Sequence, residues 1–187
     1  MTSLERVSVN RRRVVAAGGA AALLGLASAR RQTSADSVRT GGGIAGGGWI
    51  DFGASEAQFS VFGSTFVVEE SDQPVIFGSF NWVDAAGFSL ISSSIVSYGP
   101  DREDELARIM TGFVTHSETE NTHAFRLRLV DGGGPGEELD MLELLVGGET
   151  DEMDEVPEID AATAMVNVNG AITVGDVTLL TFEFTGE

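Results

Sequence analysis

Four acidic residues flank a glycine-rich turn in the second half of the chain, at Asp131, Glu137, Glu138 and Asp140. Calcium is bound by carboxylate and carbonyl oxygens, which a tight turn can bring together. The spacing differs from that of an EF-hand loop. We therefore expect one of two arrangements. Either Asp131, Glu137 and Asp140 are ligands of a calcium or other cation, or Asp131 accepts backbone N–H groups in a turn whose glycines adopt positive φ.

The two histidines of the chain, His116 and His123, bracket a polar segment typical of a hairpin turn. Two imidazoles together with Glu118 or Glu120 would make a metal site with few protein ligands. Two solvated turn histidines are the simpler interpretation. The sequence has no cysteine, no Gly-x-Ser-x-Gly motif and no His-Glu-x-x-His motif. We identify no catalytic residue and no cofactor-binding residue, so a non-enzymatic protein is favoured.

Acidic residues dominate the composition. The chain has 29 Asp and Glu residues against 11 arginines, no lysine, and a formal net charge of −18. Residues 149–160 contain seven acidic residues and no basic one, which predicts a solvated loop. Such a surface repels the phosphates of nucleic acid, while salt at about 1 M shortens the Debye length to about 3 Å and screens the self-repulsion. We expect a halophilic protein with no nucleic-acid partner.

The N-terminus has the three parts of an export signal. Asn10-Arg11-Arg12-Arg13-Val14-Val15 fits the twin-arginine pattern, an apolar run extends to Leu26, and Ala27-Ser28-Ala29 offers small residues for cleavage. The apolar run is shorter than the about 20 residues of a membrane-spanning helix. We expect a twin-arginine signal peptide over residues 1–29 and a secreted or extracytoplasmic chain without stable membrane insertion. An uncleaved signal that anchors the protein is the alternative.

The rest of the chain reads as β structure, because its apolar residues mostly alternate with period two. Turns rich in Gly, Pro, Asp and Ser separate these runs, which predicts an all-β fold, an antiparallel β-sandwich or barrel of about eight short strands. Asn169-Gly170 predicts a two-residue hairpin, and we assign Trp49, Trp82 and Tyr98 to the core. The expected strands are residues 57–61, 66–68, 75–83, 88–98, 106–114, 125–129, 139–146, 164–168 and 177–184.

Glycine density sets the expected start of the folded domain. Residues 30–48 are polar and then glycine-rich, which predicts a flexible spacer because glycine loses the most backbone entropy on ordering. We expect a single β domain over residues 49–187 that carries the acidic loop 149–160.

Several segments carry a likeness to a known family. They occur in the order Gly46-Gly47-Gly48-Trp49-Ile50, residues 57–61, Gly78 to Asp84, residues 87–93, and Phe125 to Gly136. The last segment ends in Asp131-Gly132-Gly133-Gly134-Pro135-Gly136, with Asp140 after it. This pattern resembles the post-COAP-1 domain, a secreted β domain, over roughly residues 46–146. The resemblance implies a β fold and an extracellular location, and it implies no reaction. The acidic loop 149–160 departs from the glycine-rich C-terminal segment of that family.

These patterns together predict a non-enzymatic secreted or cell-surface β module with a structural or adhesion role. Its partner would be an extracellular protein or a component of the cell envelope. A small-ligand-binding β-barrel and a secreted hydrolase with an unrecognised site are the alternatives. An apolar cavity with convergent polar groups would favour ligand binding, and clustered carboxylates with raised pKa values in a cleft would favour an enzyme.

Overall fold

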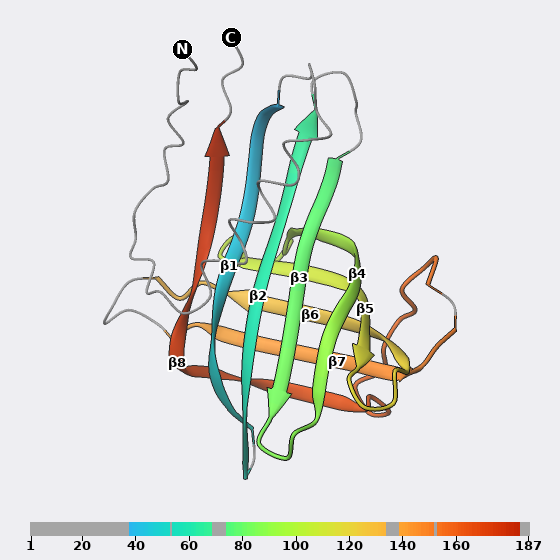
Figure 1. Ribbon diagram of the computed structural model, residues 1–187. Coiled ribbons are helices and arrows are strands. Elements are labelled where there is room, and N and C mark those ends of the chain that lie inside the picture. The colour runs from blue at the N-terminus through green and yellow to red at the C-terminus, as the bar shows by residue number, and fades with distance from the viewer. Residues whose placement is uncertain (1–37, 53, 69–73, 134–138, 152, 184–187) are drawn as a thin grey trace, which may run out of the picture.

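Eight antiparallel strands form a closed barrel in chain order (Figure 1). The computed structural model describes residues 38–52, 54–68, 74–133, 139–151 and 153–183, and only the backbone of 38–40, 67–68 and 183. The all-β prediction is confirmed, with the barrel as the architecture. The strands are β1 (Val38–Phe52), β2 (Ser55–Val68), β3 (Pro74–Asp84), β4 (Ser89–Pro100), β5 (Ala107–His116), β6 (Thr122–Val130), β7 (Met141–Glu149) and β8 (Val166–Glu183).

The described ranges contain no helix, and so none that is long and apolar enough to cross a membrane. The strand predicted over residues 106–114 is β5, which begins at Ala107 and extends to His116. The signal peptide predicted over residues 1–29 lies outside the described residues and stays a prediction.

β8 closes the barrel by changing partner along its length. Its first part pairs with β7, and the strand then continues beside β1, from Ile172 to Glu183. In Figure 1, β1, β2 and β3 run upright, β5, β6 and β7 cross behind them, and β8 follows first one direction and then the other. The hairpin predicted at Asn169-Gly170 is wrong, because these residues pair with Glu143 and Leu142 in mid-strand. Tertiary pairing overrides the local turn preference.

The glycine-rich segment belongs to the barrel. β1 pairs with β2 on one side and with β8 on the other from residue 41 onward. The predicted flexible spacer over residues 30–48 is therefore wrong for residues 38–48, and the domain begins before Trp49. Residues 30–37 lie outside the described part of the chain.

Close approach of the neighbouring strand explains the glycines of β1. A Cβ atom at Gly46 would overlap the backbone of Asp176 and Val177, and one at Gly48 would overlap the carbonyl oxygen of Val174. No other residue fits at such positions without moving β8. The entropy lost by ordering glycine is offset by the two long ladders that β1 completes.

Large side chains fill the barrel interior. Trp82 and Phe80 of β3 and Phe125 of β6 are fully buried, and the rings of Phe80 and Phe125 stack with centroids 5.4 Å apart. Tyr98 lies in the same core, where burial raises the pKa of its hydroxyl. Burying each such side chain stabilises the fold by about 1.5–3 kcal/mol. The core assignment is thus confirmed for Trp82 and Tyr98.

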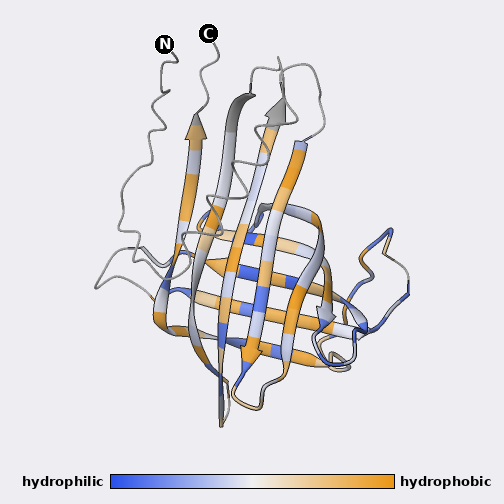
Figure 2. Ribbon diagram, in the orientation of Figure 1, coloured by the Kyte–Doolittle hydropathy of each residue, from blue (hydrophilic) through white to orange (hydrophobic). Residues whose placement is uncertain are grey.

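Hydrophobic and hydrophilic residues intermix along the strands of the barrel (Figure 2). Apolar and polar residues alternate along β6, so that Leu127 and Leu129 point inward while Arg126 and Arg128 lie on the outside. Trp49 of β1 also lies outside, 38% exposed, opposite Val174 of β8, which is 62% exposed. The assignment of Trp49 to the core is therefore wrong.

Candidate functional site

The loop between β4 and β5 folds over the outer face of the barrel. Asp101 Oδ1 accepts a hydrogen bond from the Glu103 amide at 3.1 Å, and Asp104 Oδ1 accepts one from the Leu106 amide at 3.0 Å. Such aspartate turns shape a loop without regular structure. Each aspartate uses one oxygen in this way, which leaves its Oδ2 for a different partner.

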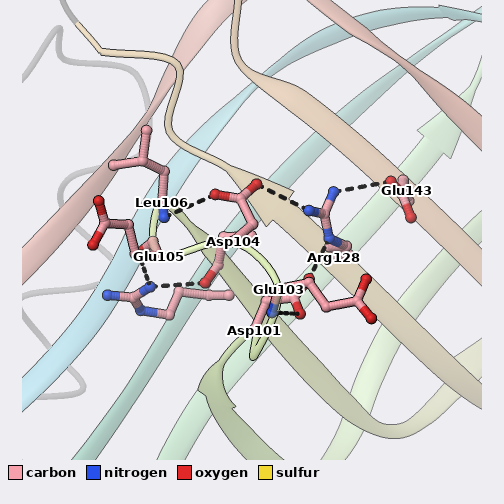
Figure 3. A network of polar contacts seen from close by, with 9 residues as sticks. Asp101, Glu103, Asp104, Glu105, Leu106, Arg128 and Glu143 are labelled. Atoms are coloured by element: carbon pink, nitrogen blue, oxygen red, sulfur yellow. Dashed lines mark hydrogen bonds and ion pairs between the residues drawn. The ribbon is translucent and has the colours of Figure 1, made fainter.

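That partner is Arg128 of β6 (Figure 3). Its Nε donates to Asp101 Oδ2 at 2.6 Å, its Nη2 to Asp104 Oδ2 at 3.0 Å, and its Nη1 to Glu143 Oε1 of β7 at 3.0 Å. The Arg128 side chain is 18% exposed. The hydrogen bond from Arg128 holds the pKa of Asp101 below its usual range, and the same bond raises the pKa of Arg128. One guanidinium therefore ties the loop to β6 and β7.

Arg126 lies two residues away on the same outer face and differs in its partners. Its neighbours across the ladder are Thr111 of β5 and Leu145 of β7, neither of which is charged. Within the described part of the chain it makes no hydrogen bond or ion pair. It acts on Asp101 only through space, contributing weakly to the lowered pKa of that carboxyl. Arg126 is thus a half-buried cation that the fold leaves unpaired.

An open groove with a volume of about 680 Å³ lies between the β4–β5 loop and strands β5, β6 and β7. Its lining combines charges of both signs with one apolar side chain from β5, and it comprises Pro100, Asp101, Arg102, Glu103, Ile109, Arg126, Arg128 and Glu143. None of the sequence motifs predicted this groove. The signal was present in the scarcity of arginine, since the only arginines after residue 39 are Arg102, Arg108, Arg126 and Arg128.

The structure brings together two of the three residues predicted as cation ligands. Asp131 Oδ1 accepts the Gly133 amide at 3.0 Å, and Gly133 has φ of 103°, which agrees with the backbone-binding turn. Asp131 Oδ2 accepts the Leu179 amide of β8 at 2.9 Å. Glu137 lies outside the described residues. Among the residues that the structure describes, no three acidic or histidine side chains form a group suited to a metal, and the cation site stays a prediction.

Asp140 completes this contact with β8. It is only 9% exposed, and its carboxylate accepts the Val177 amide at 2.6 Å and the Gly132 amide at 2.8 Å. Burial raises the pKa of Asp140, the two amides oppose that rise, and the nearby Asp176 adds to it. Asp131 and Asp140 thus bind the amides of Leu179 and Val177, which lie on the part of β8 that has left β7 and pairs with β1. Capping these amides in this way stabilises the closure of the barrel.

The two histidines do not form a metal site with neighbouring acids in the described structure. His116 Nδ1 lies 3.2 Å from the Thr119 amide, and its ring packs on Phe88 with centroids 4.7 Å apart. His123 is buried, with Nδ1 3.3 Å from the Gly147 carbonyl oxygen. His116 therefore stabilises the turn between β5 and β6, whereas His123 lies against β7. The interpretation of two solvated histidines is wrong for His123.

The acidic loop 149–160 is anchored by its apolar residues. Ile159 packs over Gly147, and together with Ala124 they line a hollow of about 250 Å³ on the outer face. Asp154, Glu155 and the other described acidic residues of the loop are exposed. The prediction of a solvated loop is confirmed for these side chains.

Comparison of the chain with protein-family models, curated proteins and solved structures gives no match.

Proposed function

We propose that this chain is a non-enzymatic secreted or cell-surface module that binds its partner through the outer face of the barrel. The observation that carries this proposal is the filled interior. Trp82, Phe80 and Phe125 occupy the space that a small ligand would need, and both hollows described above lie on the outside. A binding function then belongs to the surface.

The carboxylates support a non-enzymatic role. Among the described acidic residues, Asp140 is the one whose pKa is raised. Its two oxygens are taken up by the amides of Val177 and Gly132. A general acid or base needs a free oxygen within reach of a substrate, and this carboxylate acts instead as a structural acceptor.

Export can be tested with the twin-arginine pair. In the double variant Arg11→Lys/Arg12→Lys, the chain should remain in the cytoplasm, whereas the parent should be found outside it and be accessible to added protease. Arg13→Lys is the matched control, since it leaves Arg11-Arg12 in place. A parent chain retained in the cytoplasm would refute the proposed location.

Native mass spectrometry of the exported protein separates the surface module from a ligand-carrying barrel. We expect the mass of the polypeptide alone, beginning near Arg30 if the signal is cleaved. A small molecule that co-purifies and is released only on unfolding would favour the ligand-binding alternative.

A further inference from the structure

We propose that the groove beside Arg126 binds a sugar acid. The ligand carboxylate pairs with the Arg126 guanidinium, and ligand hydroxyls donate to the acidic side chains of the groove. This inference rests on the proposed surface-binding function and names its ligand class.

Positive charge is confined to one part of the described barrel. The described arginine side chains all come from the β4–β5 loop, β5 and β6. Arg128 is held by three carboxylates, and Arg108 Nη1 donates to the carbonyl oxygens of Glu105 and Ala107. Neither the exposed Arg102 nor the half-buried Arg126 has either kind of partner in the described structure. A half-buried charge without a partner is unfavourable for the fold alone, and an external anion would satisfy it.

The surroundings of Arg126 favour an anion with a single charge. A planar guanidinium binds a carboxylate with two parallel hydrogen bonds. The groove also contains Asp101, Glu103 and Glu143. A doubly charged phosphate would be repelled by these carboxylates more strongly than a singly charged carboxylate. Two arginines of the groove have no hydrogen bond or ion pair in the described structure, the exposed Arg102 and the half-buried Arg126, and the ligand carboxylate pairs with Arg126.

The other side chains of the groove favour hydroxyl groups and a sugar ring on the same ligand. Ionised carboxylates only accept hydrogen bonds. Glu143 uses Oε1 on Arg128, and Glu103 contributes only its backbone amide to the loop, so both retain acceptor oxygens. Hydroxyl groups are suitable donors, and Ile109 offers an apolar surface for the carbon face of a sugar ring. The groove volume of about 680 Å³ falls in the range of small-ligand sites.

Titration of the isotope-labelled full chain tests this directly. The probes are D-glucuronate, glucose, acetate and inorganic phosphate, each followed through the backbone amides of β5 to β7 and the arginine Nε–Hε signals. We expect glucuronate to shift the Arg126 signal and its neighbours, with clearly weaker effects of glucose, acetate and phosphate. Arg126→Met should weaken glucuronate binding at least tenfold, and Arg102→Met, on the exposed rim, should weaken it less.

Several results would overturn the inference. They are the absence of glucuronate binding, binding unchanged in Arg126→Met, and acetate or phosphate binding as tightly as glucuronate. The fold of each variant is checked by its amide spectrum, so that lost binding is not confused with unfolding. A chain that is exported and surface-exposed but does not bind glucuronate would lose this inference and retain the proposed function.

Discussion

Replacing Arg128 with methionine should destabilise the barrel, whereas the same replacement of Arg126 should leave its stability nearly unchanged. Both arginines lie on the outer face of β6, two residues apart, and methionine keeps much of the apolar stem. The difference lies in their partners, since Arg128 binds three carboxylates and Arg126 binds none in the described structure.

The magnitude follows from the geometry of the Arg128 contacts. They are short, from 2.6 to 3.0 Å, but the carboxylates remain 13–33% exposed, so each counts for less than a buried charged hydrogen bond. Losing the guanidinium also leaves three like charges close together. We expect Arg128→Met to reduce the free energy of unfolding by about 2–3 kcal/mol and Arg126→Met by less than about 0.5 kcal/mol.

Thermal and urea unfolding of both variants measure this difference. In a domain of this size 1 kcal/mol shifts the Tm by about 2–4 °C, so Arg128→Met should lower it by about 5–10 °C at low salt. The loss should shrink at about 1 M KCl, because screening weakens the repulsion among the remaining carboxylates. Equal effects of the two substitutions, or no effect of Arg128→Met, would refute the reasoning.

Three further predictions concern the rest of the barrel. Because burial and the nearby Asp176 raise the pKa of Asp140, the folded state keeps its proton to higher pH than the unfolded state. This contribution to stability should therefore fall as the pH rises above the ordinary value of 3.8 through the raised pKa. Asp176→Asn should stabilise the protein at neutral pH and flatten this pH dependence, whereas Asp151→Asn, which removes an exposed charge, should not flatten it. Gly48→Ala should lower the free energy of unfolding by about 3 kcal/mol, because its Cβ would overlap β8, while Gly99→Ala, with open space around it, should change it by less than about 0.5 kcal/mol. The Tm should rise with molar KCl or NaCl alike through charge screening; a separate rise at millimolar CaCl₂, reversed by a chelator, would establish the predicted cation site.

Period-two alternation predicted the strands whose two faces meet different surroundings. It located β6 correctly, because Leu127 and Leu129 face the core while Arg126 and Arg128 face solvent. It failed where long-range packing decides the conformation. The backbone entropy of the β1 glycines, considered alone, predicts a flexible segment. The close approach of β8, which follows more than 120 residues later, cannot be predicted from the local sequence.

The turn at Asp131 shows the same division. The local half of the contact, from the Gly133 amide to Asp131 Oδ1, follows from the residue types and was expected. The distant half joins Asp131 to an amide 48 residues away and Asp140 to one 37 residues away. These bonds form because β8 leaves β7 and pairs with β1. The Asn169-Gly170 pair predicts a hairpin turn at a point where the strand in fact continues.

The two arginines of β6 differ in what they bind: Arg128 binds carboxylates of this chain, and Arg126 is the proposed contact for an external ligand. A single guanidinium takes three carboxylates from two segments of the chain, although the next arginine on the same face is two residues away and has none. If acidic residues merely paired with the nearest available arginine, the carboxylates would be shared between the two. The concentration of all three on Arg128 leaves Arg126 without a hydrogen bond or ion pair in the described structure, and only its weak through-space effect on Asp101 remains. Arg126 is one of only four arginines after residue 39, and the proposed sugar acid would give it the partner that the described structure does not.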